Sequence, residues 1–155
     1  MNKPEIRTLV KNGALLSELD YERALLADRT LRIMVKEEPG LANLRNELRG
    51  LIVAYESLKW SDPNNISDKQ LNESELAEKQ ISTEQQFYLW RKEIILSRLN
   101  ELGLIQKDLG TLLNHSKSYT SELLNGIRAF SSNDLILIHK LLKIWMTYKS
   151  RSEIV

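Results

Sequence analysis

The residues with the clearest chemical potential lie in one short stretch, "LLNHSKSYTSELLNGIR", residues 112–128. Its leucines stop at Asn114-His115, and a lysine, Lys117, then stands among five hydroxyl side chains before the leucines return. The free backbone amides of a helix start bind phosphate, and lysine and serine side chains can meet base edges in a major groove. The stretch therefore indicates either a solvated helix cap or a surface that touches a negatively charged, hydrogen-bonding partner.

Two short helices around a tight turn must position these residues. Leu109 and Leu113 share one face of the first helix, and Thr120, Leu123 and Leu124 form the apolar face of the second. Once that face points inward, the other side chains of the second helix are expected to point outward: Lys117, Ser118, Ser121 and Glu122.

The turn itself needs residues with particular backbone properties. Gly110 is small enough for two steeply crossing helices to approach closely, at some cost in helix propensity. Asn114 is the non-glycine residue most able to take the left-handed conformation of a sharp turn. Ser116 then follows as the N-cap of the second helix. Taken alone, Ser116 is as consistent with a plain N-cap as with a DNA contact. Tyr119 is likewise as consistent with packing against the rest of the domain as with a DNA contact.

The longer stretch "LIQKDLGTLLNHSKSYTSELLNGIRAFSSNDLILIHKLLKI" resembles the helix-turn-helix of the lambda-repressor-like (XRE) regulators. The pattern of that family runs roughly L-T-Q-x-x-L-A-x-x-L-G-x-S-x-x-x-[VI]-S-x-x-x-N-G-x-R. More narrowly, "SELLNGIR" followed by "SNDLILIHKLLKI" is similar to the HigA type, the antitoxin half of bacterial toxin–antitoxin operons. The likeness is specific over residues 99–144 and looser over residues 18–57.

The resemblance implies DNA contacts at eight positions of this sequence. Gln106 matches a glutamine that binds backbone phosphate, and Lys107 is the cation beside it. Lys117 and Ser118 match the positions that read bases, and Arg128 matches a basic loop residue that faces the DNA backbone. The cap or flanking positions that often touch phosphate are Ser116, Tyr119 and Ser121. The role of Glu122, at an outward recognition position, stays open.

Several residues depart from the family pattern. Ile105 replaces the usual capping threonine, which predicts a less well ordered start of the first motif helix. Gly110 stands where alanine is commoner, Asn114 where glycine is, and His115 where an apolar residue is frequent. The terminal "KIWMTYKSRSEIV" lacks the common L-G-[IV] turn, so the last helix is expected to run on and fray.

The front half is predicted to be helical as well. Residues 9–16 are expected to form a short helix around Gly13, and the next helix is expected to run from Asp20 to a stop at Pro39-Gly40. Residues 41–60 form the clearest amphipathic segment, and two helices joined by Pro-Gly are typical of an antiparallel hairpin. Its apolar positions repeat by threes and fours: Leu41, Leu44, Leu48, Leu51, Ile52, Tyr55 and Leu58.

A domain boundary is predicted near residue 80. Residues 1–80 form an N-terminal helical region that ends in a polar linker, 61–80, and residues 81–155 form the helix-turn-helix domain. Ser82 and Gln85 have capping-box spacing, which predicts that a helix begins there and ends at Gly103. One apolar stripe is expected along it: Phe87, Trp90, Ile94, Leu99 and Leu102.

Composition and motif content argue against several classes of function. A chain with 42% hydrophobic and 28% charged residues has ordinary soluble composition, and the absence of cysteine excludes disulfides and thiolate metal sites. His115 and His139 do not show the spacing of a metal site, and no phosphate loop or nucleophile–base pairing is visible. No catalytic residue, metal or cofactor is therefore expected.

Charge and hydropathy set expectations for location and partners. No stretch approaches the roughly 18 consecutive apolar residues of a membrane span and no secretory run opens the chain, so a cytoplasmic protein without membrane contact is expected. Residues 1–80 carry 12 Lys/Arg and 14 Asp/Glu, whereas residues 81–155 carry 10 and 7. The two parts therefore favour different partners.

Together, pattern and resemblance predict an all-α protein in which an N-terminal helical hairpin region precedes a lambda-repressor-like helix-turn-helix domain. The resemblance implies a homodimer that binds double-stranded operator DNA, represses its own operon and neutralises a HigB-type mRNA-cleaving toxin held by the N-terminal part. Two other interpretations stay open. One is a repressor with no toxin partner, and the other is a helical protein-interaction module whose helix-turn-helix is inert.

Overall fold

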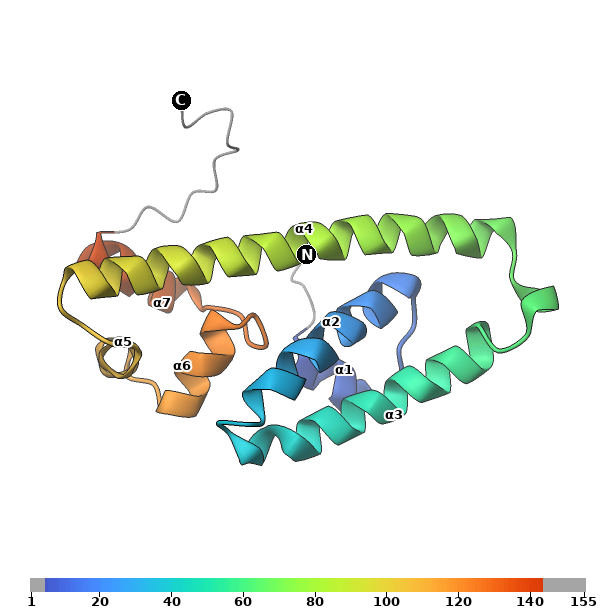
Figure 1. Ribbon diagram of the computed structural model, residues 1–155, viewed down its shortest axis with the longest axis horizontal. Coiled ribbons are helices and arrows are strands. Elements are labelled where there is room, and N and C mark those ends of the chain that lie inside the picture. Colours follow the sequence, from blue (N-terminus) through green and yellow to red (C-terminus); the bar gives the residue numbers. More distant parts are fainter. Residues whose placement is uncertain (1–4, 144–155) are drawn as a thin grey trace, which may run out of the picture. The chain divides into compact units, whose positions relative to one another are not determined.

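The computed structural model describes residues 5–143, and every regular element within them is helical. This confirms the all-α class. Residues up to Phe87 form one compact unit, the front unit, and residues from Tyr88 onward form a second, the back unit. Helix α4 (Asp68–Glu101) runs through this division and supplies residues to both units (Figure 1). Within the described residues, none of the helices combines the length and apolar character that a membrane crossing needs.

The other helices of the front unit are α1 (Ile6–Asn12), α2 (Glu18–Met34) and α3 (Ala42–Lys59). Helix α1 ends where Gly13 takes a left-handed φ of 79°, so the prediction of a helix continuing through Gly13 is wrong. Helix α2 begins two residues before the expected Asp20 because the Ser17 hydroxyl caps it by accepting from the Asp20 amide at 3.1 Å. It ends at Met34, before the Pro39–Leu41 3-10 turn that leads into α3.

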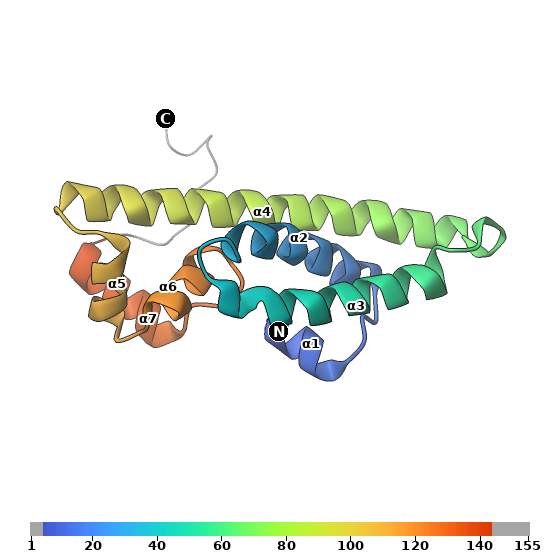
Figure 2. The same ribbon diagram turned by 60° about the horizontal axis from the view of Figure 1, so that its bottom comes forward.

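Helices α2 and α3 pack along each other (Figure 1, Figure 2). Five members of the predicted stripe are buried, namely Leu41, Leu44, Leu48, Ile52 and Tyr55, whereas Leu51 is half-buried and Leu58 is 77% exposed. Buried apolar side chains shared by the two helices supply most of the cohesion, because the hydrophobic gain grows with the apolar area removed from water. They are Ala24, Leu26, Ala27, Leu31, Met34, Leu44, Leu48 and Ile52.

Three polar contacts fix the alignment of α2 with α3. The Tyr55 hydroxyl donates to Glu18 at 2.7 Å, and the Tyr21 hydroxyl donates to Glu56 at 2.9 Å. The two tyrosine rings stack with centroids 4.9 Å apart. Further along the pair, Arg45 on α3 binds Asp28 on α2 at 3.0 Å.

The predicted linker over residues 61–80 is much shorter in the structure. A 3-10 turn at Pro63–Asn65 is followed at once by α4, which runs for 34 residues from Asp68. The polar residues after 67 include no glycine or proline, so nothing in the backbone stops a helix there. Ala77 and Ile81, four residues apart, are buried in the front unit. Amphipathicity at only two positions was too weak a signal to identify this helix from sequence.

The start of α4 also corrects the predicted helix start at Ser82. Ser82 and Gln85 lie in the helix interior, and the cap is Ser67, whose hydroxyl accepts from the Gln70 amide at 3.1 Å. Further along, Arg23 of α2 binds Glu84 at 2.9 Å, which holds this part of α4 on the front unit.

The back unit contains α5 (Gln106–Leu113), α6 (Lys117–Leu124), α7 (Ser132–Leu137) and a π-helical turn (Ile138–Leu142), which join the end of α4. Its core is apolar and consists of Ile95, Leu99, Leu109, Leu113, Leu124, Ile138 and Leu142. The predicted stripe on α4 is correct at Leu99 but wrong at Leu102, which is exposed, and it missed Ile95. The predicted run-on of the last helix concerns residues 144–155, which lie outside the described residues.

The cap of α4 provides the first testable prediction. Replacing Ser67 by alanine removes the acceptor for the Gln70 amide and should lower the free energy of unfolding by about 1 kcal/mol. The matched control is Ser82→Ala, which should leave stability unchanged or raise it by up to about 0.5 kcal/mol, since Ser82 is exposed in a helix interior. Urea unfolding followed by circular dichroism measures both. Equal losses for the two variants would contradict the observed helix start.

Candidate nucleic-acid interface

The turn between α5 and α6 has the backbone that the sequence predicts. Asn114 is left-handed, with φ 59° and ψ 43°, and the His115 amide donates to the Gly110 carbonyl at 2.8 Å. A Cβ at Gly110 would lie 2.9 Å from the Thr120 hydroxyl oxygen and 3.0 Å from the His115 carbonyl oxygen. Both steric predictions are confirmed: a residue that tolerates the left-handed region turns the chain, and a glycine permits the close approach.

The starts of both helices are capped, although by different means. The Ser116 hydroxyl accepts from the Tyr119 amide at 3.1 Å, so the predicted N-cap of α6 is confirmed. Ile105 has no acceptor to cap α5, but its own amide donates to the Asp108 carboxylate at 2.8 Å. Helix α5 therefore begins at Gln106 despite the missing threonine, and the expected weakness at this end is compensated by Asp108.

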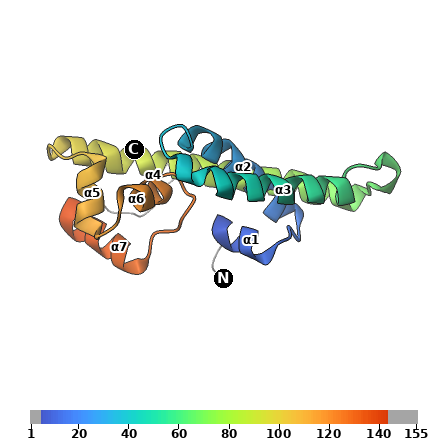
Figure 3. The same ribbon diagram turned by 90° about the horizontal axis from the view of Figure 1, so that it is seen from below.

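One face of α6 is buried as predicted. Thr120, Leu123 and Leu124 are all essentially inaccessible to solvent, whereas Lys117 and Ser118, on the first turn, are exposed. Figure 3 shows α5, α6 and α7 together in the back unit. The first turn of α6 is thus available to a ligand, because the opposite face already holds the helix in the core.

The expected outward position of Glu122 is wrong. Only 4% of this residue is exposed, because the segment after α6 folds back across it. The Glu122 carbonyl accepts from the amides of Ile127 at 3.0 Å and Arg128 at 3.2 Å, and the Arg128 guanidinium lies 3.6 Å from the Glu122 carboxylate. The spacing of apolar residues along α6 did not predict this burial. The burial depends on the loop after the helix and on a cation six residues away in the sequence.

Arg128 is consequently held within the back unit. Its guanidinium stacks over the Tyr119 ring at 4.2 Å. The Glu122 carboxylate, 3.6 Å from the guanidinium, partly neutralises its charge. The Tyr119 ring also stacks on His115, with centroids 4.2 Å apart. Both Tyr119 and Arg128 are half-buried, so the packing alternative left open for Tyr119 describes its surroundings in this structure.

Sequence reasoning missed a buried aspartate that ties the turn to α7. Asp134 is 2% exposed, and its carboxylate lies 2.7 Å from the His115 Nε2 atom. The same carboxylate accepts from the Ser131 amide at 3.1 Å, and the Ser131 hydroxyl accepts from the Asp134 amide at 3.0 Å. The S-x-x-D spacing at residues 131–134 is typical of such a capping box and could have predicted it. His115 thus has a structural partner where the family pattern has an apolar residue.

A second residue that the sequence did not reveal, Arg91 of α4, supports the end of α6. It is 8% exposed and donates to the Leu123 carbonyl at 3.0 Å, and its guanidinium lies 5.1 Å from the Tyr88 ring centroid and 4.6 Å from that of Phe130. Burial lowers the pKa of Arg91 to about 10, so the side chain is still cationic at neutral pH. Next to it, Lys92 donates to the Asn125 side chain at 2.9 Å.

The eight predicted contact residues all lie on α5, the turn after it, α6 and the loop that follows. The exposed ones are Lys107, Ser116, Lys117 and Ser118, and the half-buried ones are Gln106, Tyr119, Ser121 and Arg128. The Asn125 side-chain amide donates to the Ser121 carbonyl at 2.8 Å and also to the Ser121 hydroxyl oxygen at 3.4 Å. The side chains that remain accessible without any rearrangement are therefore two lysines and two serines at the starts of the two helices.

No model of a known protein family matches the chain, and no curated protein or solved structure matches it significantly. The resemblance to the HigA type thus rests on the residues quoted above.

The buried pair of Glu122 and Arg128 generates a testable prediction. Arg128→Ala removes a cation that lies 3.6 Å from the buried Glu122 carboxylate and should lower the free energy of unfolding by about 2 kcal/mol. Adding Glu122→Gln should restore part of that loss, because a neutral amide at position 122 gains less from the Arg128 cation than the carboxylate does. Thermal or urea unfolding of the wild type, both single variants and the double variant measures the coupling. Additive effects would show that the two side chains do not stabilise each other.

Proposed function

We propose that the chain is a dimeric, operator-binding repressor of the HigA antitoxin type, in which α5 and α6 form the helix-turn-helix and α6 is the recognition helix. The observation that carries this proposal is the first turn of α6. It presents Lys117 and Ser118 to solvent, while Thr120, Leu123 and Leu124 anchor the opposite face.

The first turn of α6 has the chemistry to read DNA. In a major groove, the Lys117 ammonium can donate to guanine O6 and N7, and the Ser118 hydroxyl can donate to or accept from either kind of base edge. The unpaired amides at the start of a helix favour a phosphate nearby. At the start of α5, Lys107 and Gln106 would meet the DNA backbone, which positions the protein without reading sequence.

The interior of the back unit also supports this proposal. A carboxylate on the outer face of a recognition helix would be repelled by phosphates, but Glu122 is buried beside Arg128. Arg128, for its part, stacks on Tyr119. We therefore assign Tyr119 and Arg128 to positioning the first turn of α6, and leave direct phosphate contact chiefly to the exposed lysines.

The proposed repressor acts as a homodimer in the cytoplasm. A two-fold axis would set two recognition helices about 34 Å apart, in successive major grooves on one side of the duplex. The operator should therefore be palindromic.

DNA binding is tested with a single charge removal. Lys117→Ala should weaken binding to the DNA upstream of the gene about tenfold and reduce the dependence of log K on log salt concentration by about one unit if Lys117 also neutralises a phosphate. Fluorescence anisotropy at several salt concentrations measures both quantities.

The matched control is Lys36→Ala, which removes the same charge from an exposed position of the front unit. It should bind DNA as the wild type does. If the wild-type chain shows no salt-dependent DNA binding, or if the two variants are indistinguishable, the interface on α6 is wrong.

The antitoxin part of the proposal assigns the front unit to a cognate toxin, a small mRNA-cleaving protein of the HigB type. It is supported by the likeness over residues 18–57 and by the different charge balance of the two halves. Co-expression of the full chain with the protein encoded directly beside its gene should yield a complex that survives size-exclusion chromatography. Operator binding without such a complex would favour a repressor that has no toxin partner.

A further inference from the structure

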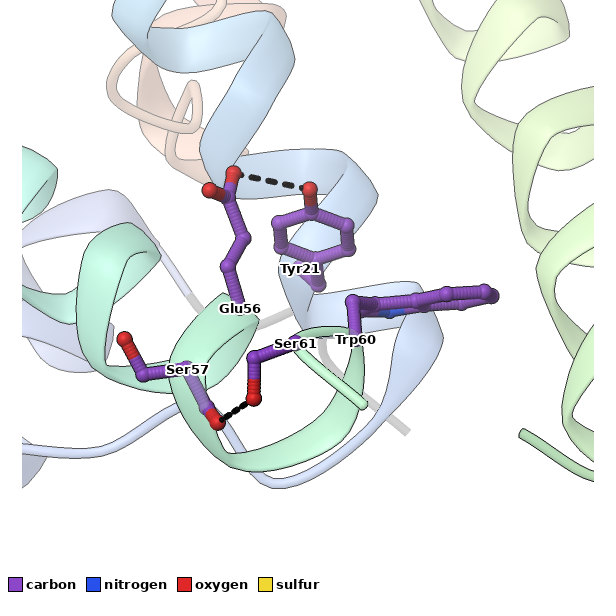
Figure 4. A pocket seen from close by; sticks show the side chains of 5 residues that line it. All are labelled: Tyr21, Glu56, Ser57, Trp60 and Ser61. Carbon is purple, nitrogen blue, oxygen red and sulfur yellow. Dashed lines mark hydrogen bonds between the residues drawn. The ribbon is translucent and has the colours of Figure 1, made fainter. Parts of the chain in front are cut away.

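A pocket opens on the front unit where α3 ends beside the start of α2. Its volume is about 630 Å³, within the range of sites that hold a small molecule or a few side chains. Figure 4 shows the side chains that surround it: Tyr21 from α2, and Glu56, Ser57, Trp60 and Ser61 from the end of α3 and the residues after it. Two aromatic rings, three hydroxyls and one carboxylate thus line the pocket.

The carboxylate of this pocket, Glu56, lacks a basic partner within the described part of the chain. One oxygen of Glu56 accepts from the Tyr21 hydroxyl at 2.9 Å, and no lysine or arginine among residues 5–143 pairs with it. Burial, this hydrogen bond and the charges of Glu56, Glu22 and Glu18 together raise the pKa of Tyr21. The tyrosine therefore remains a neutral donor, and the net charge at the pocket is negative.

Other carboxylates of the front unit do have cations. Arg23 binds Glu84 at 2.9 Å, and Arg45 binds Asp28 at 3.0 Å. These pairs engage basic side chains of α2 and α3 away from Glu56. A carboxylate beside aromatic rings attracts a cation in two ways, through a charge-assisted hydrogen bond and through the negative face of a ring.

Trp60 distinguishes between the possible cations. Its indole nitrogen is buried and has no hydrogen-bond acceptor among the described residues, although buried donors are nearly always paired. Turning the indole toward the pocket would offer this N–H to an acceptor from outside the unit. A metal ion or a simple amine supplies a positive charge only, whereas a protein segment supplies both a basic side chain and a backbone carbonyl.

We propose that this pocket receives an arginine or lysine side chain of a protein partner, with the charge against Glu56 and the alkyl stem against Tyr21 and Trp60. The charge of the front half fits such a partner, because residues 1–87 carry 12 Lys/Arg and 15 Asp/Glu. The inference rests on the proposed function only in taking this partner to be the toxin.

The pocket is tested first with a small probe and the full chain. Two-dimensional ¹H–¹⁵N spectra follow the indole N–H signal of Trp60 while Nα-acetyl-arginine amide is added. The signal should shift in a saturable way, and the neutral isostere Nα-acetyl-citrulline amide should bind about tenfold more weakly, since it lacks the charge. No shift with the arginine probe, or equal affinity for the two probes, would overturn the inference.

A variant pair then assigns the effect to one carboxylate. Glu56→Gln keeps an oxygen that accepts from Tyr21 but removes the charge, and should weaken arginine binding about tenfold. Glu47→Gln, at an exposed position of α3 that does not line this pocket, should bind as the wild type does. Undiminished binding by Glu56→Gln would overturn the assignment. The citrulline comparison needs no variant, so it holds even if Glu56→Gln folds poorly.

Binding to the toxin separates this inference from the proposed function. If the wild type and Glu56→Gln bind the toxin equally well, the pocket is not its docking site, although the antitoxin function stands. If the toxin does not bind the wild type but the arginine probe does, the pocket stands and the antitoxin function fails. The proposal expects toxin affinity to fall about tenfold in Glu56→Gln, with operator affinity unchanged.

Discussion

The burial of Thr120, Leu123 and Leu124 on one face of α6 is the constraint on which the exposed surface of the back unit depends. Helix α6 has only eight residues, so fixing three side chains on one face leaves it a single orientation. Rotating it to another face would expose two leucines, at a cost of roughly 2 kcal/mol each, and would bury the Lys117 charge. The left-handed Asn114 and the missing side chain at Gly110 permit this packing, because they let the chain turn sharply within the three residues between the helices.

Buried charges hold the surroundings of α6 in place. Glu122 lies against Arg128, Asp134 against His115, and Arg91 reaches the carbonyl of Leu123. Each contact joins α6 or its preceding turn to another segment, and breaking one would remove a partner from a buried polar side chain. The basic side chains used in this way are less available to a ligand. Lys107 and Lys117, which are exposed, are the better candidates for phosphate or base contact.

Local chemistry made the turn predictable from sequence. The conformation of Asn114, the cap at Ser116 and the inward face of α6 follow from rules that act within a few residues. The burial of Glu122 could not be predicted in the same way, because it depends on a loop that returns across the helix. Helix α4 was missed for a similar reason: residues after Ser67 show little amphipathicity, and the contacts of Ala77 and Ile81 with the front unit are not local.

The start of α5 is held without a hydroxyl cap. Ile105 has no side-chain acceptor, but Asp108 satisfies its amide from within the first turn. The candidate site could thus be located from sequence to within two helices and a loop. The accessibility of its cations could not be predicted in the same way, because Arg128 packs on Tyr119 and beside Glu122, whereas Lys117 is exposed.

The central claim is that the first turn of α6 lies in a DNA groove, and site-directed cleavage tests it most directly. The chain contains no cysteine, so Ser118→Cys provides a unique attachment point for an iron–EDTA reagent. On the DNA upstream of the gene, the conjugate should cut at two clusters of base pairs about one helical turn apart. A conjugate at Lys36→Cys, on the front unit, serves as the reference. Cleavage from position 118 that is absent, or no more localised than from position 36, would contradict the account.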